Sequence, residues 1–268
     1  MSQLTLFHGS TSVCSQKVRL AFAEIEVPYE SRLLDLQMGD QFAPEYMVLN
    51  PNAVVPTLVD NGLVVLESSL IIEYLDREYN GGKLMPEDKV GQVAARHWLL
   101  RCLDIHAAIN ALTFATVGRD RILSKMSPQE ISDSTARIPN PIARERRRDL
   151  IEHGLGAVPV KQALMHLERC LADMSISLGR GDWLSGDIFG ITDIALLPYI
   201  DRLDRLSFSG LWEDQNCITG WLTRMRQRQS YADAVENFIE KNAAVSMKAA
   251  GKSHWRGLAQ EWNAKRKI

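Results

Sequence analysis

The 268-residue sequence has few cysteines, almost no net charge and no long apolar run. Its four cysteines, at positions 14, 102, 170 and 217, include no Cys-x-x-Cys pair. They are too few for a disulfide scaffold and give no support to a structural zinc site. The formal net charge of -2 argues against a nucleic-acid-binding protein, which needs a positive field to attract phosphates. No segment offers 18 uninterrupted apolar residues, so we expect no membrane-spanning helix.

The rest of the composition is that of an ordinary globular protein. Hydrophobic residues make up 46% of the chain and charged residues 24%, and a chain of this length can form one large domain or two smaller ones. The first ten residues lack the basic start and the long apolar core of a signal peptide. We therefore expect a cytoplasmic protein with reduced cysteines, with no metal, and with neither membrane nor nucleic acid as a partner.

The first eighty residues alternate between strand and helix patterns. Residues 4–8 alternate like a short strand, and the next apolar residues recur at helical spacing, at Val18, Ala21, Phe22 and Ile25. A second strand is predicted over 29–34, and 38–49 is irregular or weakly helical. The Asn-Gly pair at 61–62 between two β-rich runs is typical of a hairpin, with a helix from about Ser68. The first two strands should be parallel, because a helix connects them, and the hairpin adds antiparallel strands.

Residues 81–88 have the composition of a linker, and the sequence beyond them is predicted to be helical. The clearest inward-facing helical stripe comprises Val160, Ala163, Leu164, Leu167, Leu171 and Met174. A second comprises Ile218, Trp221, Leu222 and Met225. Two prolines favour a long loop over 131–141, and the basic end of the chain favours a partial lid over a substrate pocket, with a frayed end as the alternative. The predicted fold is an α/β domain over 1–80, with the order β-α-β-α-β-β-α, and an all-helical domain over 89–268.

Hydroxyls and a thiol gather between the first strand and the first helix, where Ser12, Cys14 and Ser15 follow Gly9. The start of a helix carries unpaired N–H groups and a positive dipole end, which favour an anion. This position would stabilise the Cys14 thiolate or hold an external thiolate beside Ser12. The alternative interpretation is a serine that caps the helix and a small buried cysteine.

Two further segments have the chemistry of a peptide-binding site. Val55-Pro56 precedes the hairpin, and a cis bond there would leave the Val55 N–H and C=O available to an extended peptide, whereas a trans proline would be an ordinary strand start. Glu67-Ser68 begins the next helix, where a serine hydroxyl can bind a carboxylate and the glutamate an ammonium. A capped helix with a favourably placed acid is the plainer alternative.

Taken in order, these three segments resemble the thioredoxin-like domain of cytosolic glutathione S-transferases. The matching segments are residues 12–19 (SVCSQKVR), 50–58 (NPNAVVPTL) and 67–75 (ESSLIIEYL). The first is most similar to the zeta class and to tetrachlorohydroquinone dehalogenases. The resemblance covers nearly the whole chain and implies a homodimeric, cytoplasmic enzyme of detoxification that uses glutathione as cosubstrate and acts on a hydrophobic electrophile.

The resemblance also implies roles for individual residues. Ser12 would hydrogen-bond the glutathione thiolate, and Cys14 would form a mixed disulfide with glutathione. Val55 would pair with the cysteinyl backbone beside a cis Pro56. The remaining glutathione-binding residues would be Glu67 and Ser68 at the γ-glutamyl end and Gln41 near the glycyl end.

The sequence also departs from the family pattern. Val13 replaces the second serine of the zeta motif, Gly190 replaces the hydroxyl residue of the capping box that includes Asp193, and residues 121–159 form an apparent insertion. Two other functions stay open. One is Cys14-dependent chemistry, as in a thiol transferase, a reductive dehalogenase or a maleyl-type isomerase. The other is a non-catalytic interaction protein with the glutathione-transferase fold.

Overall fold

The computed structural model describes residues 4–265 and contains one four-stranded mixed sheet in the order β2-β1-β3-β4. The strands are β1 (Leu4–His8), β2 (Glu30–Leu33), β3 (Thr57–Asp60) and β4 (Leu63–Val65). β1 runs parallel to β2 and antiparallel to β3, which forms a hairpin with β4. The predicted crossover and hairpin are both confirmed.

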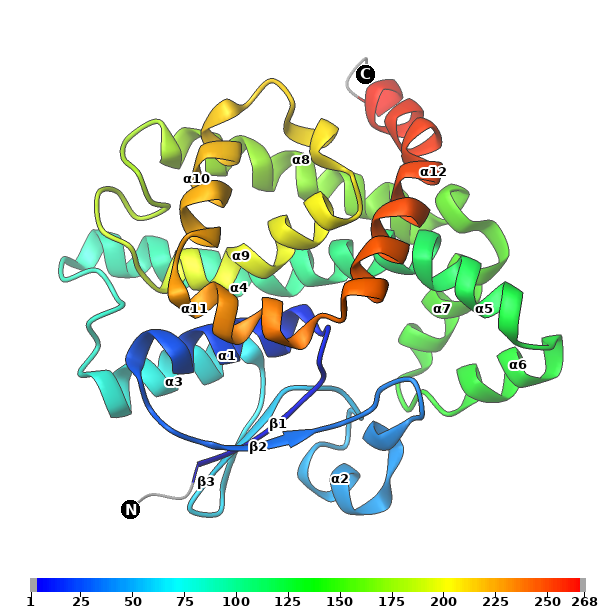
Figure 1. Cartoon of the computed structure of the whole chain (residues 1–268), viewed down its shortest axis with the longest axis horizontal. Coiled ribbons are helices and arrows are strands. Elements are labelled where there is room, and N and C mark those ends of the chain that lie inside the picture. The colour runs from blue at the N-terminus through cyan, green and yellow to red at the C-terminus, as the bar shows by residue number, and fades with distance from the viewer. Residues whose placement is uncertain (1–3, 266–268) are drawn as a thin grey trace. The chain divides into compact units, whose positions relative to one another are not determined.

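Helices complete the first part of the chain in the predicted order. They are α1 (Val13–Ile25), the short 3-10 turn η1 (Asp40–Phe42), α2 (Pro44–Leu49) and α3 (Ser68–Asn80). α1 and α3 pack side by side on one face of the sheet (Figure 1). The inward residues of α1, Val18, Ala21 and Phe22, are buried because they lie on the stripe that faces α3 and the sheet.

Beyond residue 88 the described chain consists of helices joined by loops, and it has no strand apart from one isolated bridge between Trp183 and Gly186. The α-helices are α4 (Lys89–Thr113), α5 (Arg119–Lys125), α6 (Pro128–Ala136), α7 (Pro141–His153), α8 (Val158–Leu178), α9 (Ile191–Arg205), α10 (Asn216–Arg226), α11 (Gln229–Ala234) and α12 (Lys241–Lys265). The short turns are the π-helical η2 (Phe114–Gly118) and the 3-10 helices η3 (Gly154–Gly156), η4 (Ser209–Trp212) and η5 (Glu236–Phe238). Both predicted stripes, on α8 and α10, are buried.

The chain forms two compact units that do not follow the order of the sequence. The first unit combines Met1–Leu103, Met174–Ile200 and Cys217–Ile239. The second combines Asp104–Asp173, Asp201–Asn216 and Glu240–Ile268. The sequence-based division into domains at residues 81–88 stays a prediction.

The long loop predicted over residues 131–141 is wrong, because most of this stretch lies in α6 and α7. Ser127 and Glu130 form a reciprocal capping box at the start of α6. Asn140 caps α7 by accepting hydrogen bonds from two backbone N–H groups. Pro128 and Pro141 stand at the first position of their helices, where a missing N–H costs nothing. Pro141 and the small polar residues that suggested a loop therefore mark a helix start.

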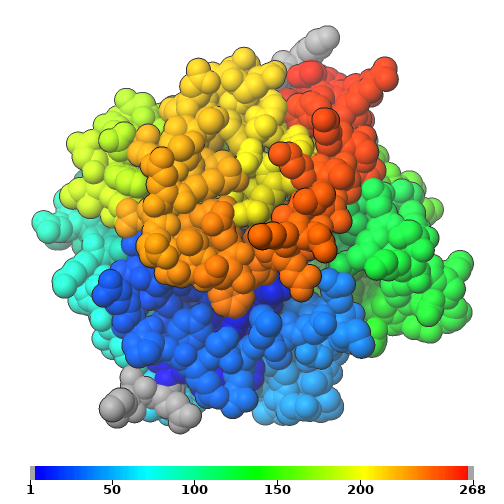
Figure 2. Space-filling model, viewed as in Figure 1, coloured from blue at the N-terminus to red at the C-terminus, as the bar shows by residue number. Residues whose placement is uncertain are grey.

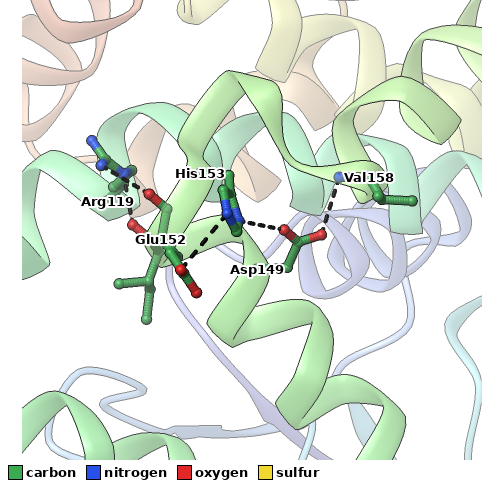
Figure 3. Close-up of polar contacts among 6 residues, drawn as sticks. Arg119, Asp149, Glu152, His153 and Val158 are labelled. Carbon is green, nitrogen blue, oxygen red and sulfur yellow. Dashed lines mark hydrogen bonds and ion pairs between the residues drawn. The ribbon is translucent and has the colours of Figure 1, made fainter.

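Side chains tie the apparent insertion into the second unit (Figure 3). Arg119 donates hydrogen bonds to the carbonyl oxygens of Ile151 (2.8 Å) and Glu152 (3.5 Å) at the end of α7. The Asp149 carboxylate accepts the Val158 N–H at the start of α8 at 3.0 Å and lies 2.8 Å from His153. One carboxylate thus connects the last turn of α7 to the first turn of α8.

The basic end of the chain is a packed helix, so the frayed-end interpretation is wrong for its described part. α12 buries Leu258 and Trp262 and contacts η2 and η4 within the second unit. In Figure 2 the red α12 lies beside green helices of the same unit. A side chain at Gly251 would meet the Leu206 carbonyl oxygen at 1.9 Å, so only glycine allows this close approach. Arg266 and Lys267 lie outside the described residues, and the partial lid stays a prediction.

The start of α9 keeps Asp193, the acidic residue of the capping box in the family that the sequence resembles, but has Gly190 in place of the hydroxyl residue. The buried Asp193 carboxylate accepts N–H groups from Gly190 (3.1 Å), Leu184 (3.0 Å) and the Trp221 indole (2.7 Å). A Cβ at Gly190 would lie 2.7 Å from the Leu84 carbonyl oxygen, which explains why glycine replaces the usual serine or threonine. Burial raises the pKa of Asp193 to about 6, against the opposing effect of these donors.

The buried Arg19 guanidinium joins three segments of the first unit. It donates to the carbonyl oxygens of Gly9 (3.1 Å) and Ser10 (2.8 Å) after β1, and of Ala234 (2.8 Å) at the end of α11. It also stacks on the Phe238 ring at 3.9 Å. In Figures 1 and 2 the orange segment 229–239 lies against blue α1, which is where this network forms.

His8, at the end of β1, is the fourth hydrogen-bonding partner of Arg19. Arg19 Nη1 lies 3.0 Å from His8 Nδ1, and His8 Nε2 lies 2.7 Å from the Ser31 hydroxyl. Arginine can only donate, so Nδ1 must accept and Nε2 must carry the proton. Burial, and secondly the charge of Arg19, lower the pKa of His8 to about 4.

We expect this histidine to make the fold sensitive to acid. The folded-state pKa of His8 lies below its ordinary value, so the unfolded state binds more protons between about pH 4 and 6.5. The contribution of neutral His8 to the free energy of unfolding is complete above that pH window and is lost as the pH falls through it. Between pH 7 and 4.5, the free energy of unfolding of the wild type should fall by about 2–3 kcal/mol more than that of His8→Asn, measured by urea denaturation.

The asparagine variant is a suitable control because its side-chain oxygen can still accept from Arg19. The titration of Asp193 has the opposite sign in this window but is common to both proteins and cancels in the comparison. If the free energy of unfolding changed with pH in the same way for both proteins, the role of His8 in the acid sensitivity would be contradicted.

Candidate functional site

Three predicted site segments meet at one edge of the sheet. β1 ends at this edge, where Phe7 pairs with Thr57 at the start of antiparallel β3. β4 ends there too, since Val65 pairs with Leu58. The turn into α1, the Val55-Pro56 segment and the start of α3 therefore leave the sheet at the same place. The order in the sequence is thus converted into a cluster in space.

The start of α1 presents Ser12 and Cys14, both half-buried. Ser12 is the N-cap, and its Oγ accepts the Ser15 N–H at 3.3 Å. Ser15 is fully buried, and its own hydroxyl accepts the Gly9 N–H at 3.1 Å. The capping interpretation of Ser12 is thus confirmed, yet it leaves the hydroxyl proton of Ser12 to donate to an anion.

The Val55–Pro56 peptide bond is cis, as the peptide-docking interpretation required. A buried polar cluster holds this turn: the Tyr46 hydroxyl and the Asn50 amide both donate to the Val54 carbonyl oxygen and both contact the Thr57 hydroxyl. Among residues 4–265, no backbone hydrogen bond involves the N–H or C=O of Val55. An extended peptide could pair with both groups.

Glu67 and Ser68 begin α3 in an unusual backbone geometry. Glu67 is exposed and has φ +68°, a left-handed value that is unfavourable for a residue with a side chain. Strain of this kind clusters at binding sites, where the surrounding structure holds it. Ser68 is buried, and the neighbouring Ser69 hydroxyl accepts a hydrogen bond from Lys17 Nζ at 3.1 Å.

Gln41 lies in η1, in the loop that follows β2. Its Nε2 donates to the Leu36 carbonyl oxygen at 3.5 Å, while Oε1 is buried with no partner within the described chain. The same loop approaches the turn after β1, because a Cβ at Gly9 would lie 2.7 Å from the Leu36 side chain. Gln41 thus has an unused acceptor in the loop beside the α1 turn.

Two buried residues near the α1 turn were missed by sequence reasoning. Tyr199 of α9 is fully buried, and its hydroxyl lies 4.0 Å from Cys14 Sγ. Lys17 is also fully buried, with Nζ 5.0 Å from the Tyr199 ring centroid. Lys17 lies one helical turn before the apolar Ala21. A charged residue on this inward-facing stripe was the sequence signal that could have identified it. No local pattern connects Tyr199 with Cys14, because the two are 185 residues apart.

Other kinds of site were sought in residues 4–265. This part of the chain holds no group of three or more histidine, cysteine or acidic side chains that could bind a metal ion. None of its helices is long and apolar enough to cross a membrane.

Comparison with known proteins connects this geometry to one family. Residues 11–78 match the family model "Glutathione S-transferase, N-terminal domain". The chain is 26% identical over 240 residues to the tetrachloro-p-hydroquinone reductive dehalogenase of Sphingobium chlorophenolicum, covering 87% of this chain and 96% of that protein.

Solved structures show the same fold. The β-etherase LigF of Sphingobium sp. strain SYK-6 superposes with a TM-score of 0.72 at 22% identity, over 88% of this chain and 99% of that one. A theta class glutathione S-transferase from Xanthomonas axonopodis pv. citri, solved with glutathione bound, superposes with a TM-score of 0.61 at 23% identity. This match covers 88% of this chain and 98% of that one. Residues 11–78 thus match the N-terminal domain of glutathione S-transferases, and 88% of the chain shares the fold of these solved structures.

Proposed function

We propose that this protein is a glutathione transferase, which activates the thiol of glutathione for attack on a hydrophobic electrophile. The observation that carries the proposal is the convergence, at one sheet edge, of a helix start with a hydroxyl, an unpaired strand-like backbone and a strained acidic residue. Each matches one chemical part of the tripeptide. The names of the related proteins support the same activity.

In this proposal each segment binds a different part of glutathione. Val55 pairs through its N–H and C=O with the cysteinyl backbone beside Pro56. The Glu67 carboxylate and the Ser68 hydroxyl bind the ammonium and carboxylate of the γ-glutamyl end, and Gln41 binds near the glycyl end. The sulfur then lies at the start of α1, where the helix dipole and the Ser12 hydroxyl stabilise the thiolate.

The reaction follows from the position of the sulfur. The thiolate attacks an electrophilic carbon of the second substrate, a carbon–sulfur bond forms, and the leaving group departs with its electron pair. Ser12 contributes one charge-assisted hydrogen bond to the thiolate. The proposal includes a cytoplasmic role in detoxification, as the resemblance to cytosolic glutathione S-transferases implies.

A second candidate function is thiol chemistry at Cys14. It is favoured by the half-buried position of this cysteine in the first turn of α1 and by the relative named as a reductive dehalogenase. Here the Cys14 thiolate attacks the glutathionyl sulfur of a disulfide substrate, the S–S bond breaks, and the other half of the substrate leaves as a thiolate. A second glutathione thiolate then attacks the glutathionyl sulfur held on Cys14, which releases glutathione disulfide and restores the Cys14 thiolate.

Single substitutions should distinguish the two chemistries. If Ser12 stabilises the glutathione thiolate, Ser12→Ala should lower the conjugation rate with an aryl halide by roughly ten- to a hundredfold, or about 1.5–3 kcal/mol. Cys14→Ser should preserve conjugation but abolish exchange with hydroxyethyl disulfide, which needs a protein thiolate. The reverse pattern would make Cys14 the catalytic group. Absence of both activities in the wild type would favour a non-catalytic interaction protein.

Binding of glutathione should depend on the start of α3. We expect the double variant Glu67→Ala/Ser68→Ala to bind glutathione at least tenfold more weakly than wild type by calorimetry, because the γ-glutamyl end loses its charged and polar partners. Glu78→Ala removes an exposed acid from the last turn of the same helix and should bind normally. Equal affinity of the double variant and the wild type would refute the assigned site.

We also propose that the protein is a homodimer. α4 exposes an apolar stripe within the first unit, with exposed fractions of 80% for Val90, 68% for Val93, 69% for Leu100 and 58% for Leu103. These residues share one helix face, and an exposed apolar face of this kind is typical of an interface.

Sedimentation at micromolar concentration should give a dimer for the wild type and a monomer for Leu100→Asp, because a carboxylate would be buried unpaired in the interface. Ile188→Asp places the same charge on a residue that is 77% exposed outside the stripe, and it should stay dimeric. A monomeric wild type would contradict the proposal.

A further inference from the structure

Lys17 is buried, and within residues 4–265 its ammonium group has no acidic partner. Its side chain is fully enclosed, and its ammonium group has one hydrogen bond, to the Ser69 hydroxyl, although it can donate three. No carboxylate in the described chain lies within ion-pair distance of Nζ. A buried charge is costly unless an anion compensates it, so this position favours a negative group nearby.

Tyr199 lies between this cation and the Cys14 thiol. The ammonium of Lys17 lies over its ring at 5.0 Å, and its hydroxyl is 4.0 Å from Cys14 Sγ. Burial raises the pKa of Tyr199 well above its ordinary value, so the phenol stays protonated and can donate. A cation over the ring withdraws electron density from it and thereby strengthens the O–H donor.

α1 brings the same groups together from its own side. Cys14 and Lys17 are three residues apart and therefore lie on one face of the helix, in its first two turns. The positive end of the helix dipole acts at the same place. The Cys102 thiol of α4 also faces the Tyr199 hydroxyl, but its S–H is within 4.0 Å of the Ala195 carbonyl oxygen, which gives it another acceptor.

We propose that Tyr199 and Lys17 are positioning residues that hold Cys14 as a thiolate, with Tyr199 donating its O–H to the sulfur and Lys17 supplying the compensating positive charge. The inference rests on the second candidate function, the thiol chemistry at Cys14, because it gives Cys14 the properties of a nucleophile for disulfide-type substrates. Tyr199 and Lys17 act through Cys14 and need not touch glutathione.

The test measures ionisation of Cys14 in the full-length protein without glutathione. Iodoacetamide alkylation is followed from pH 5 to 10 by mass spectrometry of the Cys14 peptide. Cys217, the other half-buried cysteine, is read in the same samples as an internal control. The midpoint is the pH at which the alkylation rate of a cysteine reaches half its maximum, and we expect it to be much lower for Cys14 than for Cys217. Tyr199→Phe should raise the Cys14 midpoint by about one pH unit, which slows its alkylation about tenfold at acidic pH.

Variants at Lys17 separate charge from packing. Lys17→Met should raise the Cys14 midpoint, whereas Lys17→Arg should keep it low, and Cys102→Ala should change neither midpoint. The proposal is overturned if the wild-type midpoint of Cys14 equals that of Cys217, a result that needs no variant to fold. It is also overturned if Tyr199→Phe and Lys17→Met leave the midpoint unchanged. Glutathione is absent throughout, so failure of the proposed transferase activity is a separate result.

Discussion

The position of the candidate site depends on the hydrogen bonds of the buried Arg19 guanidinium. Its rigid plane of N–H donors bonds to carbonyl oxygens after β1 and at the end of α11 simultaneously, and it also stacks on Phe238. A lysine, with one compact ammonium, could not hold these segments in the same geometry. Because the turn after β1 leads directly into α1, Ser12 and Cys14 take their positions from this network. The neutral state of His8 is part of the same arrangement.

The second constraint is the polar cluster around the Val54 carbonyl oxygen. Tyr46 and Asn50 donate hydrogen bonds to that oxygen and contact the Thr57 hydroxyl. Buried, hydrogen-bonded side chains thus hold the turn in place. Within residues 4–265, the N–H and C=O of Val55 take part in no backbone hydrogen bond. The α1 turn is built in the same way, with Ser15 buried beneath it. In both places inward side chains provide rigidity and leave the outward groups available to a ligand.

Sequence reasoning succeeded where the signal was local and periodic. The strands, the hairpin and the inward stripes of α8 and α10 follow from patterns of two or 3.6 residues. It failed over residues 131–141, because a proline at the first position of a helix and a proline in a loop look the same until the N-cap is seen. Local chemistry selected Ser12, Cys14, the Val55-Pro56 segment and the Glu67-Ser68 segment. The resemblance added Gln41 and the binding role of each residue, and these roles stay a proposal. The cis geometry at Pro56 is confirmed.

The sequence by itself determined the order of the elements in the first eighty residues, with their crossover and hairpin, because these depend on neighbouring residues. Only the tertiary structure decided which distant groups meet. Tyr199 reaches Cys14 across 185 residues, and Leu84 approaches Gly190 so closely that only glycine fits. A buried lysine on an inward helix face is an anomaly in the sequence and becomes interpretable beside an aromatic ring and a thiol. The physical reason is that burial and electrostatic partnership depend on packing between segments, which no local pattern encodes.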